Sequence, residues 1–169
     1  MNYHKIEKTS IVNGAGIRVV LWVSGCSFHC KGCHNPETWN ANSGKPFDQE
    51  SKIELFNALN KPYIQGITFS GGHPLEGCNR STIYGLIKEI KEKFPEKDIW
   101  LYTGYTWEEI FDNDIADIQS ILCLVDVLVD GKYIEEQKDL TLKWRGSRNQ
   151  RVIDVKASMK QEKVVLWEQ

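Results

Sequence analysis

The chain has 169 residues, of which 41% are hydrophobic and 26% charged, and its formal net charge is −2. This length suits a single domain, expected over residues 1–169, and the composition is ordinary for a globular protein. The small net charge excludes a global field that would attract nucleic acid or an anionic membrane. No apolar run is long enough to span a membrane, and the N-terminus lacks a signal-peptide core, so we expect a cytoplasmic protein with reduced thiols.

The first half of the chain begins its regular structure with an apolar run. Residues 17–24 are mostly β-branched or aromatic, which predicts a strand buried on both faces. Arg18, near its start, suits a turn or a solvated edge. A polar stretch follows, and then Asp48 is a plausible N-cap for a helix that ends at Leu59. Residues 66–70 predict a short strand that runs into two glycines.

The second half repeats the alternation of helix and strand. Ser81 can cap a helix that runs to about residue 94, because its apolar residues recur at steps of three and four. Thr106 and Glu109 have capping-box spacing and predict a helix that continues to residue 122, with a break near Asn113. Further strands are expected at residues 98–102, 125–129, 151–155 and 164–167.

Strands that alternate with helices predict a mainly parallel sheet built from βαβ units. Glycines and polar residues follow the predicted strands at Ser70-Gly71-Gly72, Thr103-Gly104 and Asp130-Gly131-Lys132. In parallel α/β folds, ligands bind at this carboxyl edge. Because the chain is too short for eight βα units, we expect an α/β fold with an incomplete (βα) barrel and a site at its mouth.

Three of the five cysteines, Cys26, Cys30 and Cys33, stand close together after the first predicted strand. Thiols this close in a chain without a secretory signal indicate metal ligands rather than disulfides. A 4Fe–4S cluster held entirely by protein needs four cysteines, so three would leave one iron open to a substrate. A closed zinc site that adds His29 or His34 is the alternative.

The spacing Cys-x-x-x-Cys-x-x-Cys resembles the cluster motif of the radical S-adenosylmethionine (radical SAM) enzymes. Other segments resemble the activating enzymes of glycyl-radical enzymes within that family, and the resemblance extends over nearly the whole chain. These segments are NGAGIR at 13–18, CHNPETW at 33–39, SGGHPL at 70–75, DIWLYTGY at 98–105 and WRGSRNQ at 144–150. The ordered set is much more specific than the cysteine motif alone.

The resemblance implies a radical SAM domain whose 4Fe–4S cluster is held by Cys26, Cys30 and Cys33, with S-adenosyl-L-methionine (SAM) on the open iron. Such a cluster splits SAM into methionine and a 5′-deoxyadenosyl radical, which abstracts hydrogen from a C–H bond. The implied partners are the glycyl loop of the large subunit of an anaerobic ribonucleoside-triphosphate reductase, and reduced flavodoxin or ferredoxin as electron donor. Another glycyl-radical enzyme, a small substrate, or a non-enzymatic zinc module are the alternatives.

The expected SAM contacts lie in the loops after the strands. Glycines let backbone carbonyls approach the methionyl ammonium group, and the backbone near the third cysteine is expected to contact adenine. No general acid or base is expected, because hydrogen-atom abstraction does not need one. The expected cofactor-binding residues are Gly32, Cys33, His34, Ser70, Gly71, Gly72, His73, Thr103 and Asp130.

Two positions depart from the wider family pattern. His73 follows the glycine pair where an acidic residue is usual; if that carboxylate matters, SAM affinity would depend on pH through the imidazole. Gly32 stands where many radical SAM enzymes have an aromatic residue that packs on adenine, although glycine is familiar in this subfamily. His34 is a candidate stacking partner in its place.

The remaining candidates carry weaker signals. Arg145, Arg148 and Arg151 form a local basic cluster that suits a solvated face or a docking surface for the partner protein. Cys123 lies in an apolar run and is expected in the core, whereas Cys78 lies in a loop and has no assigned role.

Overall fold

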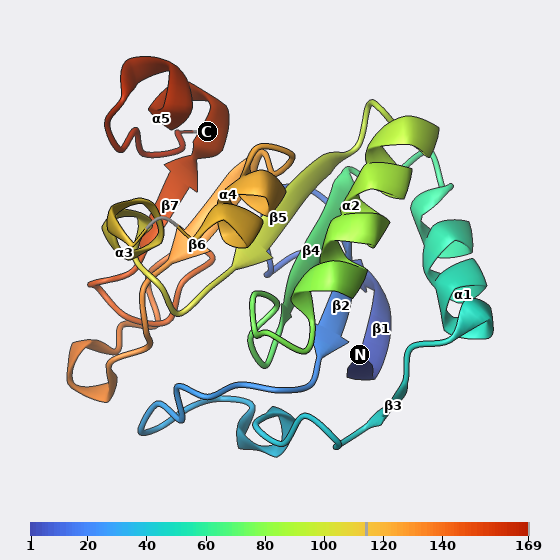
Figure 1. Ribbon diagram of the computed structural model, residues 1–169, viewed down its shortest axis with the longest axis horizontal. Helices are drawn as coiled ribbons and strands as arrows, with labels where there is room; N and C mark the ends of the chain where they lie inside the picture. Colours follow the sequence, from blue (N-terminus) through green and yellow to red (C-terminus); the bar gives the residue numbers. More distant parts are fainter. Residues whose placement is uncertain (114, 169) are drawn as a thin grey trace.

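The computed structural model describes residues 1–113 and 115–168 and contains one open, seven-stranded sheet (Figure 1). The four central strands pair in parallel, and the strands outside them pair antiparallel. The mostly parallel α/β sheet predicted from the alternation is therefore confirmed. In sheet order the strands are β3 (Lys45–Pro46), β1 (Asn2–Ser10), β2 (Arg18–Val23), β4 (Gly66–Gly71), β5 (Asp98–Tyr102), β6 (Val127–Asp130) and β7 (Arg151–Asp154).

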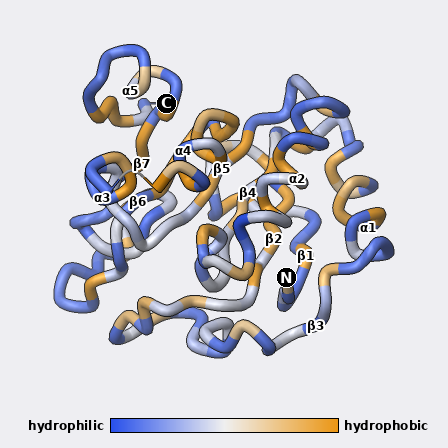
Figure 2. Tube along the Cα trace, in the orientation of Figure 1, coloured by the Kyte–Doolittle hydropathy of each residue, from blue (hydrophilic) through white to orange (hydrophobic). Residues whose placement is uncertain are grey.

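Helices α1, α2 and α4 pack against one face of this sheet and enclose the main core (Figure 1). The opposite face carries a smaller aromatic cluster centred on Trp100, which contacts Trp144 and Trp167 edge to face. Figure 2 shows the apolar residues concentrated along the central strands and the polar ones on the loops. The helices are α1 (Gln49–Leu59), α2 (Arg80–Lys93), α3 (Trp107–Asp112), α4 (Ala116–Leu122) and α5 (Val155–Gln161), with short 3-10 helices at Pro36–Thr38 and Glu135–Gln137.

Two of the three predicted helix N-caps are found in the structure. Asp48 caps α1 by accepting the Ser51 backbone N–H, and Thr106 caps α3 in a full capping box, so both predictions are confirmed. The Ser81 cap is wrong, because α2 begins one residue earlier, at Arg80, after Asn79. The predicted helix over residues 106–122 is divided into α3 and α4 near Asn113, as expected, although residue 114 lies outside the described residues.

Strand β1 was not predicted, because its sequence NYHKIEKTS has too few apolar residues for a clear period of two. At the other end of the chain, the expected strand at 151–155 ends at Asp154, which caps α5. Residues 164–167 do not form the expected strand and make a single bridge, between Leu166 and Ile153. No helix among the described residues is long and apolar enough to cross a membrane.

Two side chains lie opposite to their expected environment. Arg18 is fully buried and forms an ion pair with Asp98, so it is not a solvated edge residue. Its Nε donates to Oγ1 of Thr68 at 2.9 Å, and burial lowers the pKa of the guanidinium while Asp98 raises it. Cys123 is exposed at the C-terminal cap of α4 and not a core residue, because the apolar stripe of α4 faces the sheet through Ile118, Ile121 and Leu122.

A cysteine-lined cavity at the carboxyl edge of the sheet

A cavity of about 440 Å³ opens at the carboxyl ends of the parallel strands. Most of its wall comes from four segments that are far apart in the sequence and that lie at the ends of the strands β2, β4, β5 and β6, and Val12 and Asn13, after β1, complete it. The predicted meeting of these segments at one mouth is thus confirmed. The predicted site residues on the wall are Cys26, Cys30, Cys33, His34, Ser70, Gly71, Gly72, His73 and Thr103.

The cysteine loop is held open by its backbone rather than wound into a helix. Gly25, His29 and Gly32 all have positive φ angles, of 93°, 46° and 73°. The loop is tied to the short 3-10 helix, because the Gly25 N–H donates to the Thr38 carbonyl at 2.7 Å. This turning backbone, and not a helix, carries the three thiols that line the cavity wall.

The three thiols suit an iron–sulfur cluster by their chemistry and setting. All three are half-buried, and they are the only cysteines on the wall among the described residues, since Cys78 and Cys123 are exposed elsewhere. Burial raises the pKa of the Cys26 thiol, and the neighbouring Cys30 and Cys33 raise it further against opposing backbone hydrogen bonds. Thiolates that destabilise one another in this way are stabilised by cationic iron. Within the described ranges, no three His, Cys, Asp or Glu side chains converge as ligands of a single metal ion.

The glycine pair after β4 lets two backbones meet. A Cβ on Gly71, whose φ is 101°, would lie 2.7 Å from the Val23 backbone nitrogen, and one on Gly72 would lie 2.6 Å from the Gly25 carbonyl oxygen. Hydrogen bonds close the same contact, since the Gly72 N–H donates to the Val23 carbonyl at 2.8 Å. The glycines therefore bring the end of β4 against the start of the cysteine loop.

His73 is a buried member of the wall. Its Nε2 lies 2.9 Å from Oγ1 of Thr103, and the rings of Phe28 and Tyr105 contact it edge-on. Its Nδ1 has no hydrogen-bond partner and lies 3.7 Å from a carboxylate oxygen of Glu76. Burial lowers the pKa of His73 to about 4, although Glu76 acts in the opposite direction. The imidazole is therefore neutral at neutral pH.

A 4Fe-4S single cluster domain is the family model that matches this chain, over residues 12–153. The chain is 49% identical over 154 residues to the anaerobic ribonucleoside-triphosphate reductase-activating protein of Enterobacteria phage T4, covering 90% of this chain and 93% of the relative. The proteins of the same name from Vibrio cholerae and Escherichia coli K12 are 45% and 46% identical over 152 residues, covering 89% of this chain and 96% of each relative. This chain belongs to the family of anaerobic ribonucleoside-triphosphate reductase-activating proteins. The 4Fe–4S cluster predicted from the cysteines is confirmed by the domain match, which spans all three of them.

Two residues that we expected at the SAM site of this family member lie off the cavity wall. Gly32 faces Glu135. Asp130 is buried, and its carboxylate accepts hydrogen bonds from the Arg151 side chain and the Trp107 backbone N–H. These placements give Asp130 a role in holding β6, β7 and α3 together, and they do not support a direct cofactor contact.

The three arginines of the expected basic cluster each interact with a different part of the protein. Arg151 pairs with Glu108 and Asp130, which raises the pKa of its guanidinium. Arg145 donates to the Gln150 carbonyl, and Arg148 lies 3.9 Å from Asp139. Only Arg145 of the three lines the cavity.

Several functional candidates escaped the sequence analysis of this activating-protein family member. Glu76 accepts the Ser27 backbone N–H at 2.9 Å and so joins the loop after β4 to the cysteine loop. Burial raises the pKa of the Glu76 carboxyl, but the hydrogen bond from Ser27 and the nearby His73 lower it, and the net pKa is below its usual value. Tyr133, Leu140 and Trp144 reach the wall from the segment after β6, which has few regular elements. The sequence signal that could have found Glu76 is its spacing of three residues from His73.

Proposed function

We propose that this protein is a radical SAM activase that generates a glycyl radical on an anaerobic ribonucleoside-triphosphate reductase. The observation that carries the proposal is three half-buried thiols on one wall of an open cavity, in a chain whose relatives are named as activating proteins of that reductase. We assign the open sheet to an incomplete barrel of radical SAM type, with residues 1–169 as one radical SAM domain.

In this proposal, Cys26, Cys30 and Cys33 hold three irons of the cluster and leave the fourth for the amino and carboxylate groups of SAM. When bound, the reduced cluster would pass one electron to the sulfonium of SAM, whose bond to the adenosyl carbon would break to give methionine and a 5′-deoxyadenosyl radical able to take a hydrogen atom from the glycine. We assign the SAM contacts on the cavity wall to Cys33, His34, Ser70, Gly71, Gly72, His73 and Thr103.

The task of the chain's own residues is to orient the ligand and to exclude water. Phe28 packs against both His73 and Tyr105, which also contact each other, and lies next to Gly104, where a Cβ would come within 2.4 Å of its ring. Apolar packing of this kind keeps the wall between the thiols and the strand ends dry, which protects a reactive radical from side reactions.

The mouth of the cavity suits a protein substrate. Its border includes Val12 and Leu140, which are 68% and 84% exposed, and Ile11 beside Val12 is 74% exposed. Large apolar side chains this exposed at a cavity mouth favour burial by a partner. We therefore propose that the glycyl loop of the reductase large subunit docks there. Reduced flavodoxin or ferredoxin as donor and a cytoplasmic site of action, where thiols stay reduced, complete the proposal.

The proposal is tested with anaerobically reconstituted protein. Metal and sulfide analysis should give four irons and four sulfides per chain, a content that follows from one 4Fe–4S cluster. Reduced protein should release 5′-deoxyadenosine from SAM and, when mixed with the reductase, produce a glycyl-radical signal in electron paramagnetic resonance. Cys30→Ala should abolish both, and the matched control Cys123→Ala, on an exposed cysteine away from the cavity, should retain both.

Three results would redirect the proposal. Zinc without sulfide would indicate the zinc-binding module. Cleavage of SAM with a radical only on a different glycyl-radical enzyme would change the partner. Cleavage with hydrogen transfer only to a small molecule would change the substrate class.

A further inference from the structure

The space beside Gly32 is filled from another part of the chain. A Cβ on Gly32 would lie 2.0 Å from Oε2 and 2.6 Å from Cδ of Glu135, and the glycine has a positive φ of 73°. An aromatic side chain at position 32 would displace the end of the Glu135 side chain and would strain the backbone, whose φ is positive. Both the backbone conformation and the packing of the segment after β6 on the cysteine loop therefore disfavour an aromatic residue here.

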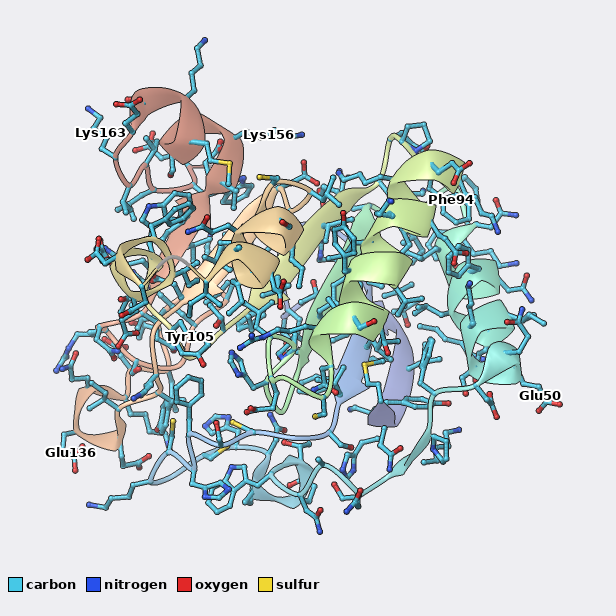
Figure 3. The ribbon with its side chains drawn as sticks, viewed as in Figure 1. Glu50, Phe94, Tyr105, Glu136, Lys156 and Lys163 are labelled. Atoms are coloured by element: carbon cyan, nitrogen blue, oxygen red, sulfur yellow. The ribbon has the colours of Figure 1, made fainter. Side chains whose placement is uncertain are left out.

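The same carboxylate positions an aromatic ring. The Tyr133 hydroxyl donates to Oε2 of Glu135 at 2.5 Å, and this bond together with the charge of Glu135 raises the pKa of Tyr133 to about 12. A second contact joins the two segments, since Nζ of Lys31 lies 3.2 Å from Glu136. Figure 1 shows the two segments approaching one another at the lower left, and Figure 3 labels Glu136 at the outer end of the segment after β6.

Most aromatic rings on the cavity wall, unlike Tyr133, are covered by neighbouring protein side chains. Phe28 is packed between other rings, the Trp39 ring contacts His29 at 4.7 Å, and Trp144 packs in the tryptophan cluster. Tyr102 is buried and donates its hydroxyl to the Trp144 carbonyl. These rings are occupied by protein neighbours.

The ring of Tyr133 has one ring neighbour among the described residues, the exposed His34, at a centroid distance of 5.8 Å and an angle of 56°. Tyr133 is half-buried, and the backbone at Gly146 supports it, because a Cβ there would lie 3.1 Å from its ring. Both Tyr133 and His34 line the cavity beside Cys33. The pair thus offers a supported but incompletely covered aromatic surface next to the thiols.

We infer that Tyr133 is the stacking surface for the adenine of SAM, supplied from the segment after β6 in place of an aromatic residue at position 32, with His34 at its side. The inference rests on the proposed function and adds an adenine-binding residue to it. Stacking on an aromatic ring does not require side-chain hydrogen bonds to the base, because every base offers a π-face.

The test measures binding of S-adenosylhomocysteine, which carries the same adenosyl group but is not cleaved, to anaerobically reconstituted protein by equilibrium dialysis. We compare ring-bearing variants, Tyr133→Phe and Tyr133→Trp, with ringless ones, Tyr133→Leu and Tyr133→Met. The ringless variants should bind about tenfold more weakly, and the ring-bearing ones should stay within about threefold of the parent protein. Tyr63→Leu, on an exposed tyrosine off the cavity wall, should bind as the parent does.

Only variants with the parent's iron content are compared. Equal affinity of ring-bearing and ringless variants would overturn the inference. Loss of the cluster from both ringless variants would also overturn it, because Tyr133 would then hold the loop and not the ligand. A parent protein that binds no S-adenosylhomocysteine would contradict the proposed function itself, which is a distinct result.

Discussion

His73 and Thr103 lie 2.9 Å apart, with the imidazole Nε2 facing the hydroxyl oxygen across the floor between β4 and β5. Thr103 Oγ1 also accepts the Tyr105 backbone N–H at 3.1 Å. If the neutral imidazole accepts a hydrogen bond from the Thr103 hydroxyl at Nε2, its Nδ1 carries the proton and faces Glu76. His73, which departs from the family pattern, is therefore a buried, neutral, hydrogen-bonded residue of the wall, and it does not replace the charge of an acidic side chain.

Because burial lowers the pKa of His73 to about 4, its protonation does not change near neutral pH. Contrary to the dependence suggested by sequence, we expect the affinity for S-adenosylhomocysteine to be flat between about pH 6.5 and 8. Equilibrium dialysis across this range checks the expectation. A tenfold change that disappears in His73→Gln would restore the pH-dependent interpretation.

The same pKa predicts how stability responds to acid. The folded state resists protonation of His73 that the unfolded state accepts below about pH 6.5, so the free energy of unfolding should fall as pH decreases from 6.5 toward 4. One proton contributes a slope of at most about 1.4 kcal/mol per pH unit. Urea unfolding of the parent and of His73→Gln between pH 6.5 and 5 measures it, and equal slopes in the two proteins would refute the assignment to His73.

The buried ion pair of Arg18 should dominate stability on the aromatic face of the sheet. Arg18→Ala removes the donor to the Ile67 carbonyl and the cation paired with Asp98, whose side chain is 29% exposed and also accepts from Gln65 Nε2. This partial exposure places the expected loss at the lower end for a broken buried pair, about 3 kcal/mol. Lys8→Ala, which breaks the exposed pair with Glu54, should cost less than about 1 kcal/mol. Denaturant unfolding distinguishes the two, and similar losses would contradict the argument.

Gly72 should be intolerant of a single methyl group. In Gly72→Ala the new Cβ meets the Gly25 carbonyl oxygen at 2.6 Å, which would push the cysteine loop away from β4. We expect at least tenfold slower release of 5′-deoxyadenosine, because small displacements of reacting groups are costly, on the order of 100-fold per ångström. Gly77→Ala is the matched control, since no atom lies within 4 Å of its Cβ. Parent-like activity of Gly72→Ala would show that the loop can move without loss.

The exposed apolar residues at the mouth should contribute to binding of the reductase and not to cleavage of SAM. Combining Val12→Ser with Leu140→Ser should leave 5′-deoxyadenosine formation without reductase unchanged and weaken reductase binding about tenfold. Ile53→Ser, on α1 and 51% exposed, should change neither. Binding is measured by anaerobic sedimentation or dialysis, and unchanged affinity of the double variant would remove these residues from the docking surface.

Much of this protein follows from local patterns in its sequence. The cysteine spacing, the caps at Asp48 and Thr106, and the alternation of strands with helices were readable because each depends on residues within a few positions. The convergence of strand ends also followed, since parallel strands bring their carboxyl ends to one edge.

Tertiary structure alone decided which side chains meet across the chain. Arg18 and Asp98 are 80 residues apart, and no local pattern distinguishes their buried pair from a solvated edge. Likewise, Glu135, which accepts the Tyr133 hydroxyl, fills the space beside Gly32 only because the segment after β6 folds back onto the cysteine loop. Such contacts depend on packing between distant segments, so the spacing of neighbouring residues in the sequence does not predict them.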